Sequence, residues 1–234
     1  MHQIRNLAIA TLLIAALGVG LLVAPPQQQA SANAVQAGKQ KTINNLKQIA
    51  LALHGYHDAN QTLPPAAICD KNGKKLLSWR VAILPFLDQE ALYKEFKLDE
   101  AWDSEANKKA SATVVKTYVD PRVTDAGSKT NYRVFVGKDA AFGWEKGKRL
   151  TDFTDGSSNS IMVIAAGDPV EWAKPDDFEF DADKKLPDLT KPFADVIVVL
   201  ADGSIKNIKS DREGFDKLLK LLIQINDGEV TPDF

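Results

Sequence analysis

The first patterned segment of the chain is almost wholly apolar. Residues 7–24 carry no charge, and Arg5 lies just before them. A basic flank followed by an uncharged core is typical of a secretion signal. Eighteen residues also reach the lower limit for spanning a bilayer, roughly 17–25 residues. We therefore predict export, with residues 1–32 as either a cleaved signal peptide or an uncleaved membrane anchor.

Prolines and small residues mark the end of this segment. Pro25-Pro26 would end the apolar helix, because proline lacks a backbone N–H and clashes with the preceding turn. Three glutamines and the Ala-x-Ala sites at residues 30–34 follow, a composition that favours cleavage. Residues 33–234 are then predicted to form one globular domain.

Between Val35 and about Asn60 the apolar side chains recur at intervals of three and four residues. This spacing predicts a long amphipathic helix. Prolines at 64 and 65 end it, because a residue that precedes proline avoids the helical conformation. The predicted apolar stripe comprises Ile43, Leu46, Ala50, Leu53 and His57.

Shorter helical segments and then strands follow. Ser78 is the predicted N-cap of a segment that Pro85 interrupts, and Asp88 begins another that reaches Phe96. After these segments, β-rich runs are bounded by Gly, Asp and Pro. The Asp-Gly pair at 202–203 predicts a hairpin, since it accepts positive φ. The predicted strands are Val114–Val119, Asn131–Val136, Ser160–Ala165, Val196–Leu200 and Ile205–Ile208.

Two further segments complete the predicted order. Residues 168–195 hold nine acids against four lysines, together with four prolines, which predicts a long surface excursion. Asp211–Ile225 has helical spacing and predicts a closing amphipathic helix. A long helix, short helices, antiparallel strands and a final helix place the chain in the α+β class.

Composition narrows the function classes. With 29 Lys and Arg against 31 Asp and Glu, the formal net charge is −2, so no basic excess indicates nucleic-acid binding. Cys69 is the single cysteine, which excludes an intramolecular disulfide and a cysteine-based zinc cluster. The sequence also lacks a glycine-rich phosphate loop and a dinucleotide motif.

A series of short blocks carries a family resemblance. The blocks are Asn44–Ile49, Ala52–Asp58, Pro64-Pro65, Ser78–Val81, Leu84–Gln89, Leu92-Tyr93, Trp102–Ser104, Thr130–Tyr132, Asp155–Ser160, Trp172–Pro175 and Ala201–Ser204. In this order, over about residues 35–234, they resemble the bacterial family called domain of unknown function 1559. The resemblance implies an exported envelope protein without an established biochemical role. It also implies a pilin-like architecture, in which a long N-terminal helix, half of it in the membrane, packs on an antiparallel sheet.

The chain departs from that family pattern in two respects. A prepilin leader motif is missing, and no acid occurs between Met1 and Asp58. The docking acid and the peptidase site that the resemblance implies are therefore absent. Relatives also carry two cysteines at places that correspond here to Thr42 or its neighbours and to Val119-Asp120-Pro121. If those cysteines pair in relatives, this chain has lost both halves of the bridge.

His54, His57 and Asp58 are the first candidates for chemistry. Residues 54 and 58 lie one helical turn apart and could offer an imidazole and a carboxylate to a metal. A catalytic zinc needs three protein ligands, and no second histidine group completes the set. We therefore expect a packed, hydrogen-bonded histidine pair and keep a hydrolase that uses these residues as a minor alternative.

The other candidates are weaker. Asp155–Asn159 indicates a turn rather than a nucleophile, since Gly-x-Ser-x-Gly is absent, and no base is placed beside Cys69. A weak calcium site would use Asp176, Asp177, Glu179, Asp181, Asp183 and Asp188, although the EF-hand pattern is missing. An exposed pair among Trp79, Trp102, Trp144 and Trp172 would suit a sugar ring.

These patterns favour an exported, non-enzymatic envelope protein of pilin-like architecture that acts through protein–protein contacts. We assign no catalytic, cofactor-binding or metal residues. Expected partners are other proteins or further copies of the chain, with membrane contact through residues 7–24 if they are kept. The expected location is the periplasm, cell envelope or extracellular space. The alternative is a secreted module that binds glycan or calcium.

Overall fold

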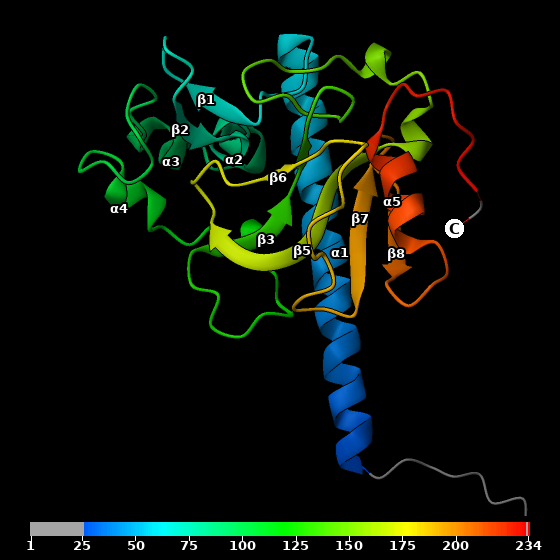
Figure 1. The fold of residues 1–234 in the computed structure, drawn as a ribbon. Helices are drawn as coiled ribbons and strands as arrows, with labels where there is room; N and C mark the ends of the chain where they lie inside the picture. The colour runs from blue at the N-terminus through cyan, green and yellow to red at the C-terminus, as the bar shows by residue number, and fades with distance from the viewer. Residues whose placement is uncertain (1–25, 233) are drawn as a thin grey trace, which may run out of the picture.

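The computed structural model describes residues 26–232 and 234. A long helix runs past a four-stranded sheet, with small hairpin and helical segments at one end (Figure 1). The helices are α1 (Pro26–Asn60), α2 (Trp79–Ala82), α3 (Glu90–Glu95), α4 (Lys108–Ser111) and α5 (Phe215–Ile223). The strands are β1 (Ala67–Cys69), β2 (Lys75–Ser78), β3 (Lys129–Arg133), β4 (Phe135–Val136), β5 (Ile161–Glu171), β6 (Phe178–Glu179), β7 (Asp195–Leu200) and β8 (Ile205–Lys209).

The apolar N-terminal segment, residues 7–24, lies outside the described residues. The predicted signal or anchor is therefore described only from residue 26 onward, and its predicted boundary at 32/33 falls inside α1. Within residues 26–232, no helix combines the length and apolar character needed to cross a membrane.

The main sheet confirms the predicted α+β class. Its strands run antiparallel in the order β3-β5-β7-β8. Asp202 and Gly203 form the predicted turn between β7 and β8, with Gly203 at φ 83° and the Asp202 carboxylate accepting from the Ser204 N–H. The hairpin was predictable because its turn residues and flanking strands are adjacent in sequence.

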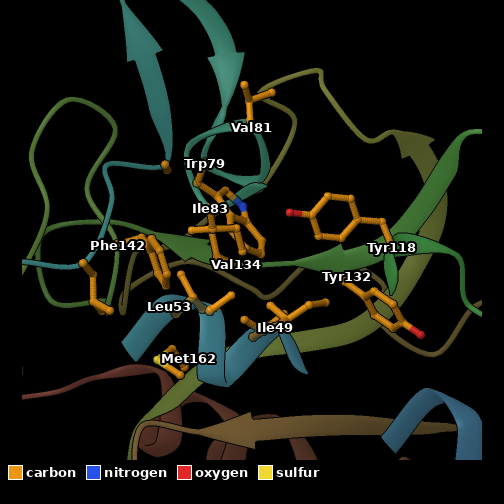
Figure 2. Close-up of a cluster of buried hydrophobic side chains, with 14 of the residues drawn as sticks. Ile49, Leu53, Trp79, Val81, Ile83, Tyr118, Tyr132, Val134, Phe142 and Met162 are labelled. Atoms are coloured by element: carbon orange, nitrogen blue, oxygen red, sulfur yellow. The ribbon is translucent and has the colours of Figure 1, made fainter. Parts of the chain in front are cut away.

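Two cores lie on opposite faces of this sheet, with α1 on one and α5 on the other. Alternation along the strands explains this, because successive side chains point to opposite faces. Figure 2 shows the α1 side, where Ile49 and Leu53 meet Trp79, Phe142 and Met162. The α1-side core includes Val163, Ala165, Ile197 and Val199, and the α5-side core includes Ile164, Ala166, Val196, Val198 and Leu200.

The predicted long helix is present and also covers residues before its predicted start. Within the described residues, α1 runs from Pro26, nine residues before Val35, to Asn60 as predicted. The alanines and glutamines between Pro26 and Val35 suit this extension, because both residue types are good helix formers.

Ser78 caps α2 as predicted, since its hydroxyl accepts from the Arg80 N–H at 3.3 Å. The predicted strand at Val114–Val119 is wrong: residues 116–118 form a 3₁₀ turn. Val115 and Tyr118, three residues apart, are buried in the α1-side core while Val114 is 53% exposed. Packing has overridden the β propensity of this run.

The surface excursion predicted over residues 168–195 is wrong in part. β5 continues to Glu171, and β6 pairs with β4 in parallel. The segment also buries Trp172, Phe178, Phe180, Leu186 and Leu189. Acidic residues between these apolar ones made the segment look solvated, but the apolar side chains anchor it to the body. The closing helix α5 begins four residues after Asp211, because Gly214 holds a left-handed φ of 72°.

Candidate functional site

His57 makes a structural contact. Its side chain is 18% exposed, and Nε2 accepts from the backbone N–H of Leu150 at 3.4 Å. Nδ1 is buried without a hydrogen-bond partner and lies 3.8 Å from the exposed Asp58 carboxylate. His54 is half-buried. Over the described part of the chain, no three His, Cys, Asp or Glu side chains are grouped to hold a metal.

The predicted turn at Asp155–Asn159 is a structural element. Ser157 and Ser158 lie in a 3₁₀ turn that follows Gly156 at φ 100°. The Asp155 carboxylate accepts from the backbone N–H groups of Asp227 and Gly228 at 2.7 and 3.0 Å. Asp155 therefore fixes the segment after α5 rather than orienting a base.

Cys69 lies partly buried on β1. Partial burial raises the pKa of its thiol, and the charge of Glu145 raises it further. Lys75 opposes that rise and Asp70 adds to it. Because the thiolate is the nucleophile, this environment lowers the reactivity of the cysteine.

Cations neutralise most of the acids proposed as calcium ligands. Asp176 contacts both Arg133 and Lys174, and Asp177 pairs with Arg80. The remaining ion pairs are Glu179–Lys75, Asp181–Lys184 and Asp188–Lys191. Five of the six acids therefore already face a cation in residues 26–232.

The tryptophans do not form an exposed pair. Trp79 and Trp172 are 0% and 1% exposed, and Trp172 donates to the carbonyl of Thr113 at 2.9 Å. Trp102 and Trp144 are half-buried. The Lys75 ammonium lies 3.1 Å from the centroid of the Trp144 ring. That contact covers the aromatic face that a sugar would use.

Arg80 and Asp177 form a buried ion pair that the sequence did not predict. Both side chains are fully buried, with Nη2 2.9 Å from Oδ1. The same Oδ1 accepts from Trp79 Nε1 and from the Val134 N–H, at 3.3 and 2.9 Å. Arg80 also donates to the Tyr132 carbonyl from Nε and Nη2. Burial lowers the pKa of Arg80 against the opposing effect of Asp177. This network joins α2, β3 and the segment before β6.

Thr42 and Asp120 lie together although 78 residues separate them. The Thr42 hydroxyl donates to Asp120 Oδ1 at 2.8 Å, and both residues are 0% exposed. Arg122 pairs with the same carboxylate, with Nη2 2.7 Å from Oδ2. A buried polar network thus occupies the two places where the family resemblance implies cysteines.

The first third of α1 projects from the body. Residues 27–37, which we call the stem, are all exposed, and Figure 1 shows them extending beyond every other element. At 1.5 Å per residue the stem is about 16 Å long. No charged residue occurs in it, and the first cation on α1 is Lys39.

A groove of about 700 Å³ lies at the base of the stem. One wall is α1 at Ala34, Val35, Gly38 and Lys39. The other walls come from residues 121–122, 192–195 and 209–211. We call this hollow the stem groove.

Three of the five charged residues that line the stem groove are paired within the chain. Lys39 pairs with Asp195, and Arg122 pairs with Asp120. The Phe193 ring covers Arg122, with its centroid 3.7 Å from Cζ. The Arg122 side chain is 7% exposed, and its Nη1 is buried without a hydrogen-bond partner. Lys209 and Asp211 also line the groove, and neither forms an ion pair within residues 26–232. The groove thus combines an apolar surface with both paired and unpaired charges.

Comparison with known proteins locates the predicted resemblance. Residues 37–137 match a family model described as protein of unknown function (DUF1559). The resemblance is confirmed over these residues, which run from α1 to β4. No curated protein and no solved structure matches the chain.

Proposed function

We propose that this chain is an exported, non-enzymatic envelope protein that works through protein–protein contacts made by the stem and the stem groove. The carrying observation is the stem itself, an exposed and uncharged helical segment that leaves the body. The stem continues the 35-residue helix α1, and all its residues are open to a partner.

The long-helix-on-sheet fold supports this proposal. α1 anchors its second half in the core through Leu46, Ile49 and Leu53, all fully buried. The same rigid helix therefore holds the stem at a fixed direction from the body. Residues 7–24 immediately precede Pro25-Pro26, so a retained membrane segment would place the stem between the bilayer and the sheet domain.

Cell fractionation combined with intact-mass measurement tests export. We expect the native protein in an envelope or secreted fraction, with a mass that shows whether residues 1–32 are kept. Exclusive recovery of the full-length chain from the cytoplasm would refute export.

Gentle crosslinking in the same fractions tests the contact role. We expect crosslinked complexes that form through stem residues. Substitutions along the stem should abolish these complexes. A protein that stays monomeric and free of partners under these conditions would refute the proposal.

A further inference from the structure

We infer that a hollow beside α1 binds the C-terminal loop of a second copy of this chain, in a head-to-tail contact. The hollow has a volume of about 330 Å³, and we call it the lysine hollow. It is lined by Lys41, Asn45, Val114, Lys116, Val119 and Pro121. The C-terminal loop is residues 226–232, which follow α5. Apart from Pro121, the contact uses neither the stem nor the stem groove, so it goes beyond the proposed function.

Two unpaired cations set the charge of the lysine hollow. Lys41 and Lys116 are exposed, and neither forms an ion pair within the described part of the chain. No acid lines the hollow, and α1 carries none before Asp58. The amide of Asn45 already donates two hydrogen bonds within the chain, at 2.9 and 3.2 Å. The free side-chain donors of the hollow are therefore ammonium groups, which favour an anionic partner.

The lysine hollow also has an apolar lining. Val114 is 53% exposed, and Val119 and Pro121 lie beside it in the same hollow. Burial of apolar surface favours association. A matching partner therefore combines an acid with a neighbouring apolar side chain.

The C-terminal loop of the chain itself has this combination. Val230 is 88% exposed. The preceding residue, Glu229, is exposed, and its carboxylate makes no hydrogen bond or ion pair within residues 26–232. Asp227 adds a second negative charge, and no cation follows Lys220 in the sequence. The loop is therefore opposite in charge to the lysine hollow and carries an apolar side chain beside its free acid.

Contacts at both ends hold the C-terminal loop on the body. At its start, the Asp155 carboxylate accepts from the backbone N–H groups of Asp227 and Gly228. After the loop, Phe234 packs against the α5-side core, and the Lys206 ammonium lies 4.8 Å from the centroid of its ring. A loop held in this way loses less conformational freedom on binding than a free tail would.

The two surfaces lie at opposite ends of the sheet, so the contact forms between copies. Two residues before Lys41, the Lys39–Asp195 ion pair joins α1 to the start of β7. Figure 1 shows the red segment after α5 leaving the body at the other end of β7, away from the stem. β7 has six residues and is about 20 Å long. A contact between two different surfaces is heterologous, and it continues as an open chain of copies when its rotation does not close a ring.

The small area of the loop predicts a weak contact. A loop of seven residues buries less than the roughly 800 Å² that each partner of a stable interface buries. Its charges are exposed, so the association should weaken as the salt concentration rises. The purified full chain in detergent, at high protein concentration, is therefore the sample for the test.

Disulfide crosslinking between two variants tests the contact. In a Cys69→Ser background, one chain carries Val114→Cys and the other carries Val230→Cys, and isotopic labelling of one chain lets intact mass identify mixed dimers. A disulfide needs Cα atoms within about 7 Å, so mild oxidation should give mixed dimers about tenfold faster than either variant dimerises alone. Leu51→Cys, at a position that is 72% exposed elsewhere on α1, replaces Val114→Cys as the matched control. It should show no such preference for Val230→Cys.

Charge reversal tests the complementarity. Lys41→Glu with Lys116→Glu sets acids against Glu229, and Glu229→Lys sets a cation against the two lysines. Like charges that face each other across an interface are costly, so each change should weaken association by about tenfold in sedimentation over a concentration series. All three substitutions in one chain restore opposite charges and should restore association. Lys71→Glu with Lys74→Glu makes the same charge change in the β1–β2 turn and should have no effect.

Three results would overturn the contact. They are mixed dimers that form no faster than unmixed ones, a combined variant that associates no better than the single reversals, and association that salt does not weaken. In the envelope fraction, crosslinking of Val114→Cys to a different protein without mixed dimers would assign the lysine hollow to that protein and refute the second copy.

The stem is unchanged in all these variants, so their failure leaves its proposed role intact. Conversely, stem substitutions that abolish no complex would refute the proposed function while the head-to-tail contact still stands.

Discussion

The buried pair of Arg80 and Asp177 gives the sharpest prediction about stability. Asp177→Ala would remove the carboxylate while the guanidinium stays fully buried. Trp79 Nε1 and the Val134 N–H would lose their acceptor at the same time. Removal of one partner from a buried pair costs about 3–5 kcal/mol. Whole domains are stable by only about 5–15 kcal/mol, so this single change removes a large share.

Asp181→Ala is the matched control from the same acidic segment. Asp181 pairs with Lys184 at 3.1 Å, but the two side chains are 44% and 79% exposed. Exposed pairs of this kind contribute about 0–1 kcal/mol. The two variants remove the same group, so their comparison separates the loss of a buried, multiply hydrogen-bonded carboxylate from the loss of an exposed one.

Urea unfolding followed by far-UV circular dichroism measures both variants, and thermal unfolding provides a second reading. We expect Asp177→Ala to lower Tm by about 6–20 °C, since 1 kcal/mol shifts a domain of this size by about 2–4 °C. Asp177→Asn, which keeps an oxygen acceptor without the charge, should lose less and remain measurable if the alanine variant does not fold. A loss for Asp177→Ala no greater than that for Asp181→Ala would refute the reasoning.

Three further predictions concern other contacts. Thr42→Val should destabilise the protein by about 1 kcal/mol in urea unfolding, because Asp120 Oδ1 loses one buried hydrogen bond while the donors from Arg122 remain; an unchanged midpoint would contradict this. Gly147→Ala should cost about 1–3 kcal/mol by overpacking, because its Cβ would lie 1.7 Å from a backbone carbonyl of the loop after α1; wild-type stability would count against the tight approach. Arg133→Gln should destabilise the protein more at pH 7 than at pH 3, because its contacts with the Asp176 carbonyl and the Phe178 ring do not titrate but its pair with the Asp176 carboxylate does. Partial burial raises the pKa of Asp176, but Lys174 and Arg133 outweigh this effect and leave it lowered. Because the pKa of Asp176 is lower in the folded than in the unfolded protein, its ion pairs stabilise the fold above the unfolded pKa, about 4, and this stabilisation is lost as the pH falls further. An equal loss of stability for Arg133→Gln at both pH values would refute the prediction.

Local sequence was sufficient where neighbouring residues decide the conformation. The three- and four-residue spacing of Leu46, Ala50 and Leu53 predicted the buried stripe of α1, and all three are buried. Ser78 predicted a helix cap from the chemistry of one hydroxyl. Asp202-Gly203 predicted the β7–β8 hairpin because positive φ is a property of the turn residues themselves.

Contacts between residues distant in the sequence explain the predictions that were wrong. Asp177 lies in an acidic segment with the composition of a solvated loop, yet it is fully buried. Its burial depends on Arg80, which lies 97 residues earlier in the chain. Val114–Val119 has strand-like residues but packs as a turn, since the core takes only Val115 and Tyr118.

The sequence by itself determined the α+β class, the long helix, the hairpin and the apolar segment that indicates export. Hydrophobic periodicity, turn chemistry and helix capping involve residues close together in the sequence, so the sequence alone predicts them. Only the tertiary structure decided which charges are neutralised, which third of α1 stays free, and that residues 34–39, 121–122 and 192–195 enclose one groove. Burial and ion pairing depend on residues that are distant in the chain and close in space, so a local sequence pattern does not predict them.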